Sequence, residues 1–155
     1  LGEKDSANAD AYKANAAAFT GQITTLRDKL AAIKTAHDGT KVAQTEPLAG
    51  YLLTEAGLVD ASPAGFTQSV EEGNSPAAAD IAAMQDLLKN RTVRAFIYNT
   101  QAVDAVTKQM LPIAEGAGVP VLRFTETLPD GVTSYIAWHT AQIDALAAAL
   151  AEPAR

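Results

Sequence analysis

Polar side chains stand at the ends of three apolar runs that resemble strands. Glu46 follows the run 41–45, Asn99 follows 94–98, and Glu126 follows 119–125. Helix-length segments separate the runs, which predicts parallel strands with crossover helices. The carboxyl ends of neighbouring parallel strands share one edge of a sheet, where open α/β sheets bind ligands. Two carboxylates and an amide at this edge predict a site for a cation or a polar small molecule.

Two alternative roles for the glutamates stay open on the residues alone. A carboxylate beside a helix start is favourable in itself, because it accepts free backbone N–H bonds and faces the positive end of the dipole. Glu46 precedes Pro47 at a predicted helix start, so capping would account for it, and Glu126 has the same alternative. A pair of carboxylates is also typical of acid–base enzymes. The alternative function is therefore half of a two-domain enzyme that uses Glu46 and Glu126 as acid and base.

Further polar residues are weaker candidates for the same edge. Gln68 would reach it if the segment 60–74 folds over as a loop, and the Glu71-Glu72 pair is expected to be a solvated part of that loop. Tyr51 falls on the first turn after Glu46 and could line the site, although packing in the core is the simpler expectation.

Composition narrows the class of protein. A chain of 155 residues with 48% hydrophobic and 19% charged residues is expected to form one folded domain. The net charge of −6 argues against nucleic acid or anionic lipid as a partner. The absence of cysteine excludes disulfides, thiolate metal sites and cysteine nucleophiles. Apolar runs fall short of the ~20 residues of a membrane span. The opening at Leu1 suggests a piece of a longer protein.

The first predicted element is a helix over 9–37. Its apolar side chains recur at alternating spacings of four and three, which places them on one stripe: Tyr12, Ala16, Phe19, Ile23, Leu26, Leu30 and Ile33. Asn8 or Asp10 is expected to cap it. The helix would measure roughly 40 Å at 1.5 Å per residue, more than a small sheet needs to cover one face. It is either a long packing helix or a spine that leads to another part of the protein.

The remaining chain alternates strands and helices. This order predicts an α/β fold, an approximately four-stranded parallel sheet flanked by helices and preceded by the long helix. A proline inside the 101–116 helix, Pro112, is expected to kink or split it. The expected elements are a strand at 41–45, a helix from Pro47 to Gly57, a short strand at 58–59, a loop at 60–74, a helix from Ser75-Pro76 to Leu88, a strand at 94–98, a helix at 101–116, a strand at 119–125, a turn at 129–131 and a last helix through Leu150.

An ordered set of motifs resembles a known family. The chain looks like the C-terminal lobe of the zinc- and manganese-binding solute-binding proteins of ABC importers, the cluster 9 or TroA-like group, some of whose members were first described as adhesins. The matching segments follow the long helix in order and are Thr45–Pro47, Gly50–Leu58, Glu71–Pro76, Phe96–Gln101, Gly118–Pro129 and Ser134–Trp138.

The resemblance implies a division of the chain and a role. Residues 1–38 would be a helix that links two lobes, and residues 39–155 the C-terminal lobe. The N-terminal lobe, which supplies two of the usual four ligands, would lie outside this chain. The protein would not be an enzyme. It would act outside the cytoplasm, periplasmic or lipid-anchored, and deliver Zn²⁺ or Mn²⁺ to the permease of an ABC importer. The isolated lobe is expected to bind metal weakly or not at all.

The resemblance also implies ligands, residue by residue. Glu46 stands where many members have histidine, and Gln68 lies near the next ligand of the family. Glu126 matches the aspartate that follows the last strand. Asn99 and Gln101 match a segment beside the site. Replacing a nitrogen ligand by carboxylates shifts the preference towards harder ions such as Mn²⁺.

Overall fold

Four parallel strands form the centre of the protein, in the order β2-β1-β3-β4. The computed structural model describes residues 1–152. The end of the predicted second segment, 153–155, lies outside the described residues. The strands are β1 Lys41–Gln44, β2 Val59–Asp60, β3 Phe96–Asn99 and β4 Val121–Phe124. The predicted α/β fold with a four-stranded parallel sheet is confirmed.

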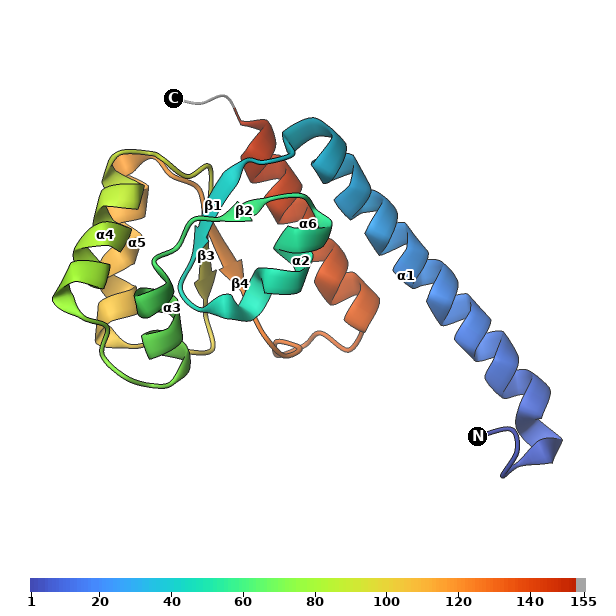
Figure 1. Ribbon diagram of the computed structural model, residues 1–155. Coiled ribbons are helices and arrows are strands. Elements are labelled where there is room, and N and C mark those ends of the chain that lie inside the picture. The colour runs from blue at the N-terminus through green and yellow to red at the C-terminus, as the bar shows by residue number, and fades with distance from the viewer. Residues whose placement is uncertain (153–155) are drawn as a thin grey trace.

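Helices cover both faces of the sheet, as buried parallel strands require. Figure 1 shows α1, α2 and α6 on one side and α3, α4 and α5 on the other. The helical elements are η1 Ser6–Asn8, α1 Ala9–His37, η2 Pro47–Ala49, α2 Gly50–Glu55, α3 Ala64–Glu71, α4 Ala78–Lys89, α5 Ala105–Ala117 and α6 Tyr135–Ala151. No helix within residues 1–152 combines the length and the apolar character needed to cross a membrane.

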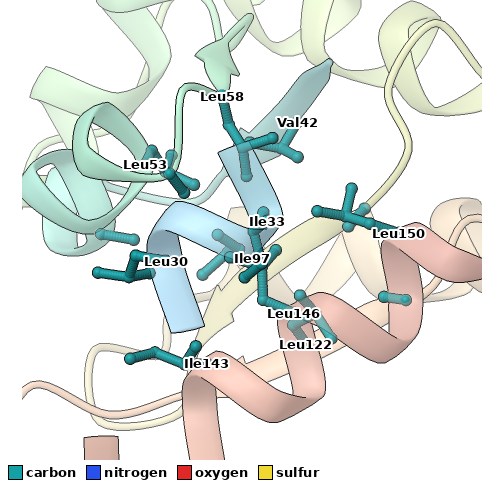
Figure 2. Close-up of a cluster of buried hydrophobic side chains, with 14 of the residues drawn as sticks. Leu30, Ile33, Val42, Leu53, Leu58, Ile97, Leu122, Ile143, Leu146 and Leu150 are labelled. Atoms are coloured by element: carbon teal, nitrogen blue, oxygen red, sulfur yellow. The ribbon is translucent and has the colours of Figure 1, made fainter. Parts of the chain in front are cut away.

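Each face of the sheet has its own apolar cluster. The first joins Leu30 of α1 and Leu146 of α6 to Val42 and Ile97 of the central strands (Figure 2). The second cluster joins side chains of α3, α4 and α5 to the opposite face of the strands, and it includes Phe66, Val70, Met84, Phe96 and Met110. Every residue of β3 is buried, so this central strand is enclosed by the two clusters.

Only part of α1 belongs to the core. Its buried residues are Leu26, Leu30 and Ile33, whereas residues 13–22 are all exposed. In Figure 1 the N-terminal half of α1 extends away from the sheet and the other helices. Asn8 is the residue before the helix, but its side chain makes no capping hydrogen bond; Asn8 Nδ2 donates to Asp5 Oδ2 instead, at 2.9 Å.

The expected loop at 60–74 is wrong, because residues Ala64–Glu71 form α3. Phe66, Thr67 and Val70 are its buried residues, and their spacing of one and three is helical. The glycine and proline residues around this short stretch conceal that pattern in the sequence.

Two expected helix starts are also wrong. Helix α4 begins at Ala78 rather than at Ser75-Pro76, and Pro76 is buried before it. Helix α5 begins at Ala105 rather than at residue 101, because Asp104 and Thr107 form a reciprocal capping box there. Asp104 Oδ1 accepts from Thr107 N at 2.7 Å. Pro112 lies inside α5 without dividing it.

Candidate metal site

Glu46 is a buried carboxylate at the carboxyl end of β1. It follows the strand closely, in extended backbone, and its residue is 5% exposed. Although Glu46 precedes η2, its side chain makes no capping hydrogen bond. Its Oε1 accepts a hydrogen bond from Asn99 Nδ2 instead. Capping of the following helix therefore does not explain this glutamate.

Asn99 ends the neighbouring strand β3 and is fully buried. Strands β1 and β3 pair in parallel, with Gln44 opposite Ile97, so Glu46 and Asn99, each two positions further along, come to the same place on the edge. The backbone N–H of Asn99 donates to Thr45 Oγ1 at 3.1 Å. Its side-chain Oδ1 accepts from the backbone N–H of Gln101 at 2.8 Å.

Glu126 lies in the loop after β4, on the other side of β3. It is exposed and precedes the start of α6 at Tyr135 by a long stretch of loop, so it caps no helix. The side chain of Gln101 orders this loop: its Oε1 accepts from the backbone N–H groups of Glu126 and Thr127, at 2.9 and 3.0 Å. Gln101 Nε2 also donates to Thr127 Oγ1 at 2.9 Å.

Side chains of α6 hold the start of the same loop. Trp138 Nε1 donates to Thr125 Oγ1 at 2.8 Å, and Gln142 Oε1 accepts from the backbone N–H of Thr125 at 3.0 Å. Trp138 in turn packs against Tyr135 and His139. Burial lowers the pKa of His139 below its ordinary value. The segment that carries Glu126 is thus anchored on both sides.

The electrostatics of the edge disfavour an ionised Glu46. Burial raises the pKa of Glu46 above its ordinary value, and the hydrogen bond from Asn99 acts against this rise. The nearby carboxylates of Glu126, Glu71 and Asp104 raise the pKa of Glu46 further. Negative charge therefore accumulates around a buried carboxylate, and a bound cation would relieve it.

Two of these acidic residues were not predicted as part of the site. Glu71 ends α3 and Asp104 precedes α5. The sequence suggested only a solvated loop edge for Glu71. Recognition of α3 as a helix would have revealed it, because Gln68 and Glu71 are then one turn apart on the same face.

The structure places the two weaker candidates as follows. Gln68 lies on α3 and is exposed. Tyr51 is 98% exposed, so the expectation that it packs in the core is wrong. A contact of either residue with a ligand stays a prediction.

The described residues of this edge do not by themselves form a complete metal-binding group. Within residues 1–152, no three histidine, aspartate or glutamate side chains converge closely enough to hold a metal ion. Zinc sites in proteins usually have four ligands. Glu46 and Glu126 alone are fewer than the ligands that such a site needs.

Comparison with known proteins identifies a family and several similar solved structures. The family described as ZnuA, zinc-uptake complex component A, periplasmic, matches residues 1–149. No curated protein sequence matches. Similar solved structures include a mutant laminin-binding adhesin, Lmb, of Streptococcus agalactiae, with 20% identity, a TM-score of 0.75, and coverage of 97% of this chain and 55% of the adhesin chain.

Two further similar structures are described with a bound metal. FpvC of Pseudomonas aeruginosa, a solute-binding protein in complex with Mn²⁺, has 23% identity and a TM-score of 0.69, over 97% of this chain and 53% of that chain. The Zn(II)-bound H205L variant of AdcAII of Streptococcus pneumoniae has 18% identity and a TM-score of 0.67, over 97% and 54%. The present chain spans about half the length of these structures.

Proposed function

The chain belongs to the family of the periplasmic zinc-uptake complex component A, and we propose that it forms the C-terminal lobe of a solute-binding protein that captures Zn²⁺ or Mn²⁺ for an ABC importer. Its length, about half that of the similar solved structures, supports the assignment to one lobe.

The buried carboxylate of Glu46 is the observation that carries this proposal. It follows a central strand, and Glu126, Glu71 and Asp104 add negative charge around it. A divalent cation would compensate this charge, whereas an anionic or neutral ligand would not. Carboxylate oxygens are ligands that harder ions such as Mn²⁺ accept readily.

We assign the ligand roles on this basis. Glu46 and Glu126 would bind the ion directly, and Gln68 would approach it from α3. Asn99 would hold the carboxylate of Glu46, and Gln101 would hold the backbone of Glu126, through the hydrogen bonds described above. Tyr51 would lie beside the site on an exposed surface.

Membership of the family suggests roles for the linking segment and for the partner protein. Residues 1–38 would link this lobe to an N-terminal lobe that supplies the missing ligands, and the exposed half of α1 supports a linking role. The importer's permease would be the partner, outside the cytoplasm. Family members are metal-transport proteins, which favours transport over the acid–base enzyme.

Metal titration of two forms of the protein tests the proposal. The present chain alone should bind Zn²⁺ or Mn²⁺ weakly, with a Kd near millimolar, because it holds only part of a coordination shell. A ligand at roughly 100 times its Kd raises the stability by ~2.7 kcal/mol. Micromolar metal should therefore leave the melting temperature of the chain unchanged and raise that of the complete two-lobe protein.

Matched variants identify the ligands in the complete protein. Glu126→Ala and Glu46→Gln should each remove most of the response to metal. Asp86→Asn removes an exposed carboxylate of α4 and should leave the response unchanged. A complete protein that responds to neither ion would contradict the transport function. Tight binding by the present chain alone would contradict the partial site.

A further inference from the structure

Asn99 connects the two candidate ligand residues. It is buried at the end of β3, the strand between β1 and β4, and both ends of its side-chain amide are used: Nδ2 donates to Glu46 Oε1, and Oδ1 accepts from Gln101 N. Gln101 in turn accepts from the backbone N–H of Glu126. A continuous set of hydrogen bonds thus runs from Glu46 through Asn99 and Gln101 to Glu126.

The direction of the hydrogen bond to Glu46 is set by this arrangement. Because Oδ1 of Asn99 faces the N–H of Gln101, the NH₂ group of Asn99 must face Glu46. One carboxylate oxygen of Glu46 is therefore engaged. Within residues 1–152, the second oxygen, Oε2, has no hydrogen-bond partner. Glu46 can therefore bind a cation through Oε2 alone while Oε1 keeps its hydrogen bond to Asn99.

This difference matters for the choice of ion. Ca²⁺ takes six to eight oxygen ligands and often binds both oxygens of one carboxylate. Ions with fewer ligands and shorter bonds, as Zn²⁺ shows with four, are satisfied by one oxygen. A cation that bound both oxygens of Glu46 would compete with the Asn99 amide for Oε1.

We propose that Asn99 determines metal specificity by holding Glu46 as a single-oxygen ligand, which disfavours Ca²⁺ relative to Mn²⁺ or Zn²⁺. The inference rests on the proposed function of the edge as a cation site. The selection against Ca²⁺ would then come from the neutral side-chain amide of Asn99, which would not itself be a metal ligand. Gln101 contributes as a second positioning residue, because it fixes the loop of Glu126.

Calorimetric titration of the complete two-lobe protein with MnCl₂ and with CaCl₂, at one pH and at matched ionic strength, tests the proposal. The quantity of interest is the ratio of the two dissociation constants. Asn99→Ala should reduce the preference for Mn²⁺ over Ca²⁺ about tenfold, because Oε1 of Glu46 becomes free for a bidentate ion. A purely structural defect would weaken the binding of both ions and leave the ratio unchanged.

A second variant protects the test against misfolding of the first. Asn99→Asp has nearly the same shape and keeps the acceptor for Gln101 N, but when ionised it donates nothing to Glu46. It should also shift the ratio towards Ca²⁺. Asn90→Ala, which removes an exposed amide after α4, should not change the ratio.

The outcomes separate this inference from the function on which it rests. Binding of Mn²⁺ with an unchanged ratio in both Asn99 variants would overturn the specificity role and leave the metal site intact. Failure of the unsubstituted two-lobe protein to bind either ion would overturn the cation site and the specificity role together.

Discussion

The two halves of α1 continue the same apolar stripe but have different environments. Leu26, Leu30 and Ile33 in the C-terminal half are buried. Phe19, two turns before Leu26 on the same face, is 47% exposed. The stripe therefore identifies the face of the helix that can be buried. It does not identify where along the helix a partner is present.

The partners of the C-terminal half are α2 and α6. The ion pairs Lys29–Asp144, at 2.6 Å, and Arg27–Glu55, at 2.9 Å, join α1 to these helices. The N-terminal half has fewer connections: Phe19 lies 6.0 Å from Tyr135 between ring centroids, and Tyr12 Oη donates to Asp5 Oδ2 at 2.8 Å. We expect the first half to open independently of the rest.

Hydrogen exchange should show the largest difference between the halves. Local opening free energies range from about 0 kcal/mol in fraying segments to the global free energy of unfolding in the core. Amides of residues 13–18 should exchange at least a thousandfold faster than those of β3, whereas amides of 27–33 should approach the protection of the strand. Equal protection of 13–18 and β3 would show that the whole helix is supported within this chain.

Truncation of one apolar side chain in each half should change the stability unequally. Leu30→Ala should lower the free energy of unfolding by ~2–4 kcal/mol, because it leaves a cavity in the cluster of Figure 2. Phe19→Ala should cost less than ~1 kcal/mol, because the ring is half exposed and its loss creates no enclosed cavity. Urea unfolding followed by circular dichroism measures both, and similar losses would contradict the difference in support.

A pair of exposed alanines offers a test without packing effects. Ala17 and Ala32 both lie on the exposed side of α1, so glycine at either position changes mainly the helix propensity, by roughly 0.5–1 kcal/mol. Ala32→Gly should lower the global free energy of unfolding by this amount. Ala17→Gly should leave it nearly unchanged and increase only the local opening of the first turns, which hydrogen exchange would detect. A global loss of the same size in both variants would argue for one cooperative helix.

The smallest effect is expected at the turn that precedes α1. Hydrogen bonds from Asn8 and then from Tyr12 lower the pKa of Asp5 below its ordinary value of 3.8. The stabilisation that Asp5 provides is therefore complete above pH 3.8 and is lost as the pH falls through the lowered pKa. In an NMR titration, Tyr12→Phe should move the midpoint of the Asp5 carboxyl upward. An unchanged midpoint would mean that the hydrogen bond from Tyr12 is not formed in solution.

Much of the fold could be predicted because its determinants are local. The spacing from Tyr12 to Ile33 identifies a helix over the observed residues, and the apolar runs before Glu46 and Asn99 identify strands to within one or two residues. Local reasoning failed for α3, whose eight residues are too few for a clear period. It failed at the start of α5, because the Asp104–Thr107 capping box competes with the propensity of the preceding residues.

The sequence by itself therefore determined most of the elements of this protein and the polar residues at the ends of its strands, since both depend on neighbours along the chain. Tertiary structure decided which of these residues meet. The strand order places β1 beside β3, so Glu46 receives a hydrogen bond from Asn99, fifty-three residues away in the chain. It also brings Glu71 and Asp104 within electrostatic range of Glu46. Such proximity depends on how helices and strands pack across the sheet, and that packing has no counterpart in the local spacing of residues.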